Sequence, residues 1–132
     1  MTQFDILPIL AGLATAAFVL TYALRTRPLG PQAWIAAATL SAAFAGWSLY
    51  AIVTGGPFGF WIEHTRNAWG VQIWFDLLLA ATCALIFMVP EARRLGMIPL
   101  PWVALVLCSG AIGLMAMLAR ILYLRHRAGQ AA

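Results

Sequence analysis

The most constraining feature of the chain is the stretch from Trp69 to Arg94, WGVQIWFDLLLAATCALIFMVPEARR. It is long and apolar enough to cross a lipid bilayer as a helix. Asp76 is the one charged residue before Glu91 in this run. A carboxyl group among hydrocarbon tails costs free energy, so such a residue needs a polar partner or has a function. The stretch therefore predicts a membrane-spanning helix that holds a polar contact.

The composition of the whole chain supports a membrane protein. Of its 132 residues 64% are hydrophobic and 9% are charged, whereas a typical soluble domain has about 25% charged residues. All eight basic residues are arginine, and most lie at the ends of apolar runs. This pattern is typical of topology signals and of contacts with anionic lipid. It argues against nucleic-acid binding, which needs a basic face exposed to water.

Turn-forming residues divide the chain into four apolar runs. Each run is about 19 residues or longer, which as a helix gives about 28 Å, close to the hydrocarbon thickness of a bilayer. We therefore expect an all-α membrane protein with four transmembrane helices in one compact bundle. The predicted spans are about 6–24, 31–53, 68–89 and 101–124, followed by a short polar tail at 125–132.

Small residues and arginines give further predictions of packing and orientation. Ala38, Ala42 and Gly46 recur every four residues and predict a close helix–helix face. Four spans place both termini on one side of the membrane. The arginines are divided equally between the two sides: Arg25, Arg27, Arg93 and Arg94 against Arg66, Arg120, Arg125 and Arg127. Giving most weight to the first span, we expect both termini outside the cytoplasm, in a bacterial inner membrane.

The long connection at 54–67, TGGPFGFWIEHTRN, combines glycine and proline with aromatic and charged residues. Aromatic side chains favour the headgroup level, so this segment is expected to lie in the plane of the membrane interface. Connections carry function more often than the scaffold does. The candidate contact residues are Phe58, Phe60, Trp61, Glu63, His64 and Arg66.

Asp76 lies about 12 Å along the third span, near the middle of the bilayer. If the third and fourth spans are antiparallel neighbours, Arg120 returns toward the membrane face at which the third span starts. We predict an intramembrane polar pair of Asp76 and Arg120, with Gln72 one turn above Asp76. Three interpretations are open: a structural ion pair, a proton or cation site, or a protonated carboxyl.

Patterns that indicate catalysis or a cofactor are weak. Cys83 and Cys108 lie in apolar runs without a CxxC pair, which predicts two small buried hydrophobes. His64 and His126 lie outside the spans, which disfavours membrane-buried haem. Glu63 and His64 are too few for a metal site. No Ser/His/Asp set or phosphate-binding glycine loop is present. We therefore expect no catalytic residue, metal or cofactor, and favour a protein that is not an enzyme.

Three motifs support a family resemblance. They are Trp74-Phe75-Asp76-Leu77-Leu78, then Glu91-Ala92-Arg93-Arg94-Leu95-Gly96-Met97, and the glycine-bearing last run that ends in Tyr123-Leu124-Arg125. From Trp69 to Arg125 the chain resembles a family of short, uncharacterised bacterial integral membrane proteins, a domain of unknown function. The resemblance implies a compact helical membrane protein and no particular substrate.

Two functions follow as expectations. The first is an accessory or assembly subunit that docks in the lipid bilayer to a larger complex, such as an energy-transducing or photosynthetic one, or to itself. The alternative is a homo-oligomeric proton- or cation-coupled small-solute transporter that uses Asp76. The chain is similar to small multidrug-resistance transporters in length and expected span number. Those transporters carry their acid in the first span, where this chain has none between Ile6 and Leu24.

Overall fold

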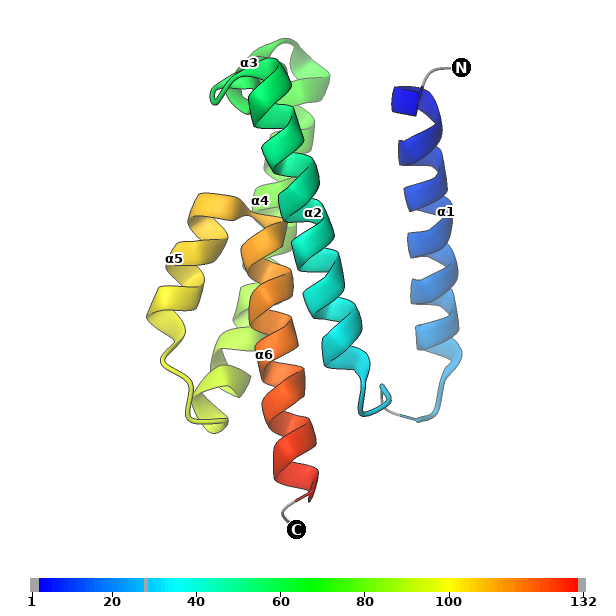
Figure 1. The fold of residues 1–132 in the computed structure, drawn as a ribbon, viewed down its shortest axis with the longest axis vertical. Helices are drawn as coiled ribbons and strands as arrows, with labels where there is room; N and C mark the ends of the chain where they lie inside the picture. The colour runs from blue at the N-terminus through cyan, green and yellow to red at the C-terminus, as the bar shows by residue number, and fades with distance from the viewer. Residues whose placement is uncertain (1–2, 28, 131–132) are drawn as a thin grey trace. The chain divides into compact units, whose positions relative to one another are not determined.

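The structure, a computed structural model, describes the backbone of residues 3–27 and 29–130 and the side chains of residues 6–27 and 29–129. The regular elements of this part of the chain are all α-helices (Figure 1). They are α1 (Gln3–Leu24), α2 (Ala33–Gly55), α3 (Gly59–Thr65), α4 (Ala68–Arg94), α5 (Pro99–Ser109) and α6 (Ala111–Gln130). The chain divides into two compact units, one ending at Gly30 and the other starting at Pro31.

The first unit contains α1, whose described side chains are all exposed. Its apolar part, Ile6–Leu24, is long enough to cross a membrane, as are α2 and α4 of the second unit. These three helices agree with the first three predicted spans. The expected membrane protein is therefore supported by three long apolar helices in the described part of the chain.

The boundaries of α4 differ from those predicted at its carboxyl end. The helix begins where the Oδ1 atom of Asn67 accepts a hydrogen bond of 3.0 Å from the backbone N–H of Gly70. It continues through Pro90 to Arg94, although the prediction ended it at Val89. A proline this close to a helix end removes one backbone hydrogen bond, which the last turn tolerates.

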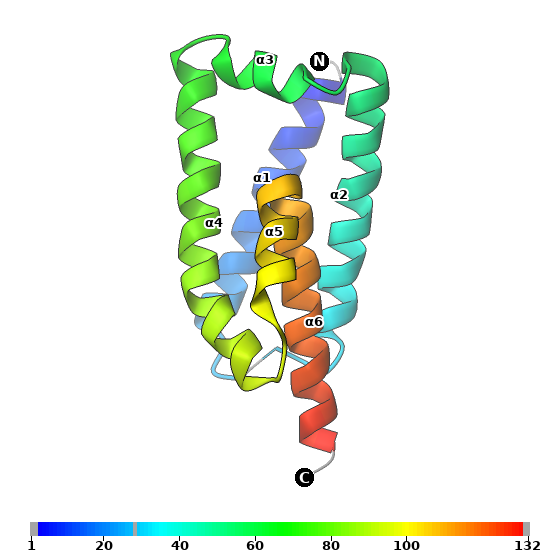
Figure 2. The ribbon, with the colours of Figure 1, turned by 90° about the vertical axis from the view of Figure 1, so that its left-hand side faces the viewer.

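The predicted fourth span at 101–124 is not one helix, and the expected count of four transmembrane helices is not confirmed. The chain reverses at Gly110, so that α5 and α6 lie antiparallel and side by side (Figure 2). Gly110 has φ +59° and ψ −124°, a conformation that favours glycine. Gly113 permits the close approach, because a Cβ atom there would lie 2.7 Å from the backbone of Leu105.

The reversal changes the end of the unit at which α6 finishes. Within the second unit α6 runs in the same direction as α4, and the last turns of both helices lie at one end (Figure 2). An ion pair joins them there, with Arg125 Nε 2.9 Å from Glu91 Oε1. The start of α2 lies at this end too, since the rings of Trp34 and Tyr123 pack at a centroid distance of 5.2 Å.

The buried interior of the second unit is small. Met117 and Ile121 of α6 and Ala92 of α4 form its core cluster. On α2 the buried residues are Ala37 and Ser41, and the hydroxyl of Ser41 donates a hydrogen bond of 2.9 Å to the carbonyl oxygen of Ile112. The expected packing face of α2 is therefore rotated: Ala42 and Gly46 are exposed, and Ala38 is half-buried.

Candidate functional site

The predicted interface segment contains the short helix α3, which lies across the ends of α2 and α4 (Figure 2). The side chains of Phe58, Phe60 and Trp61 are exposed. Exposed aromatic rings on a short helix that lies across the ends of two apolar helices are typical of the headgroup level of a membrane. The position of α3 is therefore consistent with a segment in the membrane interface.

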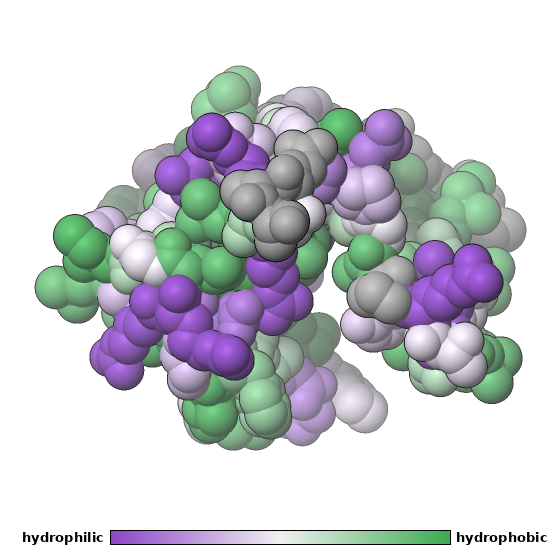
Figure 3. Space-filling model, turned by 90° about the horizontal axis from the view of Figure 1, so that it is seen from below, coloured by the Kyte–Doolittle hydropathy of each residue, from purple (hydrophilic) through white to green (hydrophobic). Residues whose placement is uncertain are grey.

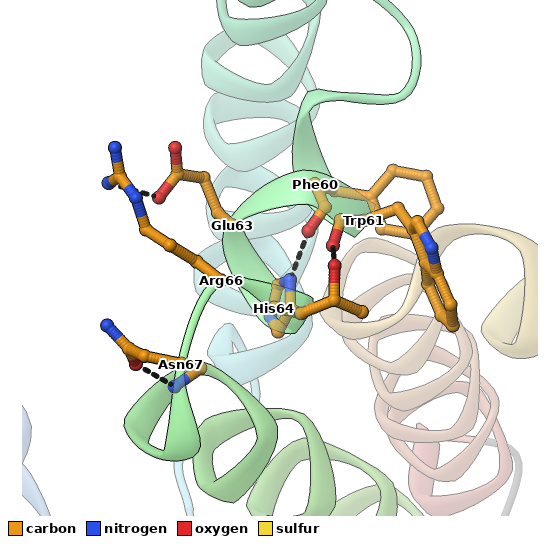
Figure 4. Close-up of polar contacts among 8 residues, drawn as sticks. Phe60, Trp61, Glu63, His64, Arg66 and Asn67 are labelled. Carbon is orange, nitrogen blue, oxygen red and sulfur yellow. Dashed lines mark hydrogen bonds and ion pairs between the residues drawn. The ribbon is translucent and has the colours of Figure 1, made fainter.

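Trp74 of α4 is the contact that holds α3 in place. Its ring lies 5.1 Å from the ring of His64, edge to face, and 6.4 Å from the rings of both Phe60 and Trp61. His64 Nδ1 lies 2.6 Å from the carbonyl oxygen of Phe60, which accepts a hydrogen bond from this nitrogen (Figure 4). This cluster explains why His64 and Trp74 are half-buried, while Phe60 and Trp61 remain exposed.

Glu63 and Arg66 form an ion pair of 3.0 Å on the outer side of this segment (Figure 4). Both side chains are more than half exposed, at 62% and 66%. An exposed pair of this spacing contributes about 0–1 kcal/mol to stability. Its main effect is that the two charges of the segment neutralise each other.

The expected intramembrane polar group forms in part. The side-chain amide of Gln72 donates a hydrogen bond of 3.2 Å to Asp76 Oδ2, one turn along α4, and both side chains are exposed. Arg120 does not join them: its guanidinium lies 5.6 Å from the ring centroid of Tyr123. Across residues 6–27 and 29–129 the ion pairs are Arg66–Glu63, Arg94–Glu91 and Arg125–Glu91.

The hairpin explains why Asp76 and Arg120 remain apart. The prediction assumed that the fourth span is continuous and returns to the membrane face at which α4 begins. Because the chain reverses at Gly110, α6 instead finishes beside Glu91, near the opposite end of α4. Sequence reasoning missed the contact between Glu91 and Arg125. The Ser109-Gly110 pair inside the expected fourth span was the sequence signal that could have indicated the chain reversal.

Among the described residues, no group of three or more His, Cys, Asp or Glu side chains is arranged so that it could hold a metal ion. Cys83 and Cys108 are free thiols, and both are exposed on the helix surface. The prediction that they are buried is therefore wrong, because the helices that carry them turn these faces away from the small core.

Comparison with known proteins gives one family. Residues 39–127, about two thirds of the chain, match the model of the family described as protein of unknown function DUF2834. The match confirms the expected membership of an uncharacterised family, and it extends further toward the amino terminus than the motifs from Trp69 onward. It starts inside α2 and ends in the last turns of α6. No curated protein and no solved structure matches the chain.

Proposed function

We propose that this chain, which belongs to the family of proteins of unknown function DUF2834, is a small accessory or assembly subunit of a larger bacterial membrane complex. In this role it has no catalytic activity of its own. Energy-transducing and photosynthetic complexes are the kinds of host that we expect. The observation that supports the proposal is the exposed Asp76–Gln72 pair on α4.

The depth of this pair explains why it calls for a partner. A helix of 27 residues is about 40 Å long, whereas the hydrocarbon layer is about 30 Å thick. If α4 is centred in the bilayer, Asp76 lies about 7 Å inside the hydrocarbon. An aspartate well inside a span costs about 2.5–3.5 kcal/mol on insertion scales. The bond from Gln72 satisfies only part of the carboxyl group, so a polar side chain from another helix stabilises it further.

The surface around Asp76 suits a docked helix. Ala80 and Cys83 follow at four and seven residues, which places them on the same helical face, and both are exposed. Small side chains allow a second helix to approach closely in a membrane. The polar contact at Asp76 then determines which helix docks, and the small residues let it pack.

The proposal is tested by purifying the full-length tagged chain from bacterial membranes in a mild detergent. We expect a partner protein to co-purify in a fixed ratio. Asp76→Asn should reduce its yield about tenfold, equivalent to about 1.4 kcal/mol of binding free energy. Glu63→Gln is the matched control: it makes the same acid-to-amide change in an exposed interface pair and should retain the partner. A chain that always purifies alone, or an Asp76→Asn variant that keeps its partner, contradicts the proposal.

The same α4 face supports the second candidate, a homo-oligomeric proton- or cation-coupled small-solute transporter. Two copies that meet through this face would bring two Asp76–Gln72 pairs together. The Cys83 thiols on this face of the two copies would then form a disulfide bond under mild oxidation. Ligand binding would depend on pH and would be lost in Asp76→Asn. A crosslinked homodimer without any other protein favours the transporter over the accessory subunit.

We also propose an orientation in the bacterial inner membrane. The equal division of the arginines depended on a continuous fourth span. With α6 finishing beside Glu91, Arg120, Arg125 and Arg127 join Arg93 and Arg94 at one end of the second unit. Arg25 and Arg27 precede the start of α2, which lies at that end as well. By the positive-inside rule this end is cytoplasmic. The carboxyl terminus is then inside, in place of the expected outside position, and the amino terminus stays outside.

A further inference from the structure

We propose that the last turns of α4 and α6 form a binding surface for anionic phospholipid headgroups, independently of the function proposed above. Five exposed arginines lie in these two helices, and Glu91 is the acidic residue among them, so the formal charge of this end is +4. Figure 3 views this end and shows hydrophilic residues gathered among apolar ones. The arginines of the surface are Arg93, Arg94, Arg120, Arg125 and Arg127.

Two of these arginines are organised by Glu91. Its Oε1 atom lies 2.9 Å from Arg125 Nε, and its Oε2 atom lies 3.6 Å from Arg94 Nη1. The Arg94 and Arg125 side chains remain 82% and 55% exposed, respectively. One carboxylate therefore holds two guanidinium groups side by side without covering them, and it neutralises a single charge. Guanidinium groups present several N–H donors that suit phosphate oxygens.

The surface lies at headgroup depth. Glu91 is 23 residues beyond Ala68, which corresponds to about 35 Å along the helix. This length exceeds the hydrocarbon thickness of about 30 Å. When α3 and the start of α4 occupy one interface, Glu91 and Arg125 must therefore lie among the phosphates of the other.

Of the arginines of α6, Arg120 lies farthest from the carboxyl end of the helix, and its side chain is directed toward the headgroup level. Its guanidinium lies 5.6 Å from the ring centroid of Tyr123, the residue three positions closer to the carboxyl terminus. The Cα–Cβ bonds of a helix tilt toward its amino terminus, so this side chain turns back along the helix. Arg127 contacts the same ring from the other side along the chain, at 6.0 Å. Such snorkelling brings the Arg120 charge toward the headgroups, whereas Arg127 already lies near the carboxyl end of α6.

Exposed apolar residues beside the arginines favour a lipid surface over a soluble acidic partner. Ile98 and Leu100, in the connection between α4 and α5 and at the start of α5, are 74% and 76% exposed. Ile98 is four residues and Leu100 six residues after Arg94 in the chain. The boundary of a bilayer offers hydrocarbon to the apolar side chains and phosphates to the arginines at one depth.

The test uses full-length protein in nanodiscs that contain phosphatidylglycerol and phosphatidylcholine with identical acyl chains. Native mass spectrometry counts the lipids of each kind that remain bound. We expect a preference for phosphatidylglycerol, and the double variant Arg93→Gln/Arg127→Gln should weaken it about fivefold for each arginine removed. Arg66→Gln, which removes one charge at the opposite end, is the control and should keep the preference.

Wild-type protein gives a second measurement that needs no variant. Raising the salt concentration from about 0.05 to 0.5 M should weaken retention of phosphatidylglycerol and leave phosphatidylcholine unchanged, because salt screens exposed charges. Equal retention of the two lipids, an equal loss in Arg66→Gln, or no response to salt overturns the proposal. Complete competition by inorganic phosphate would also overturn it, because the surface would then bind a free anion.

Discussion

At the scale of the residue, the fold of the second unit depends on a few close contacts that a single added or removed atom would disturb. Ser41 joins α2 to the first turn of α6 through a hydrogen bond to Ile112. Gly113 lets α6 touch the backbone of α5. Asp76, the conspicuous charged residue inside an apolar run, has only Gln72 as its polar contact within the helix. Packing contacts that the hydropathy pattern hides are therefore as important for the fold as the conspicuous charged residue.

Gly113→Ala is expected to destabilise the second unit by about 1–3 kcal/mol, because the new Cβ atom overpacks a tight contact. It would meet the backbone of Leu105 and Val106 at 2.7 Å, and a backbone cannot move aside as a flexible side chain can. The measurement is thermal unfolding of the purified protein in detergent.

Gly46→Ala is the matched control for this change. Gly46 lies inside α2 with no atom within 4 Å of its added Cβ. Alanine is favoured over glycine in a helix by about 1 kcal/mol, so the control should be neutral or stabilising. Equal melting temperatures for the two variants would contradict the close approach of α5 and α6.

At the scale of the element, the α5–α6 hairpin is the feature that departs most from expectation. α5 has 11 residues and is therefore about 16 Å long, roughly half the hydrocarbon thickness. It enters from the end at which α4 finishes, and α6 returns to that end beside Glu91. We therefore expect this element to be a re-entrant hairpin in a membrane, where α6 packs against α2 and both of its helices contact α4.

Spin labels at Leu100→Cys and Arg120→Cys, in a background with Cys83→Ala and Cys108→Ala, distinguish the hairpin from a continuous span. The two positions lie ten residues on either side of Gly110. In a hairpin the helix axes are about 10 Å apart, whereas a continuous helix separates the positions by about 30 Å. Double electron–electron resonance in nanodiscs should show the shorter distance. A single population near the longer distance would mean that the span is continuous.

At the scale of the whole molecule, the number of crossings sets the positions of the termini and of the charges. In the orientation proposed above, three spans and a re-entrant hairpin would place the termini on opposite sides of the membrane, whereas four spans would place them on one side. The same change moves three arginines, so that the proposed orientation assigns Arg93, Arg94, Arg120, Arg125 and Arg127 of the second unit to one face. The proposed orientation and the proposed lipid contact both depend on the single reversal at Gly110.

We expect a carboxyl-terminal fusion of green fluorescent protein to fluoresce and the corresponding alkaline phosphatase fusion to be inactive in bacterial cells, because the proposed orientation places the carboxyl terminus in the cytoplasm. A single cysteine at position 63, introduced as Glu63→Cys in a background with Cys83→Ala and Cys108→Ala, should react from outside with a membrane-impermeant maleimide. An active phosphatase fusion would contradict the orientation. It would mean that the carboxyl terminus lies outside the cytoplasm, as expected for four continuous spans.

The sequence by itself determined the all-α class, the three long apolar helices and the uncharacterised family, whereas the interface position of Phe58, Phe60 and Trp61 stays a prediction. These follow from the length of apolar runs and from residue composition, which are local properties. The tertiary structure decided the hairpin at Gly110, the pairing of Glu91 with Arg125 and the separation of Asp76 from Arg120. Hydropathy is nearly the same for one continuous span and for two helices folded back on each other. The difference arises from non-local packing of α6 against α5 and α2, where Gly113 and Ser41 make the contacts.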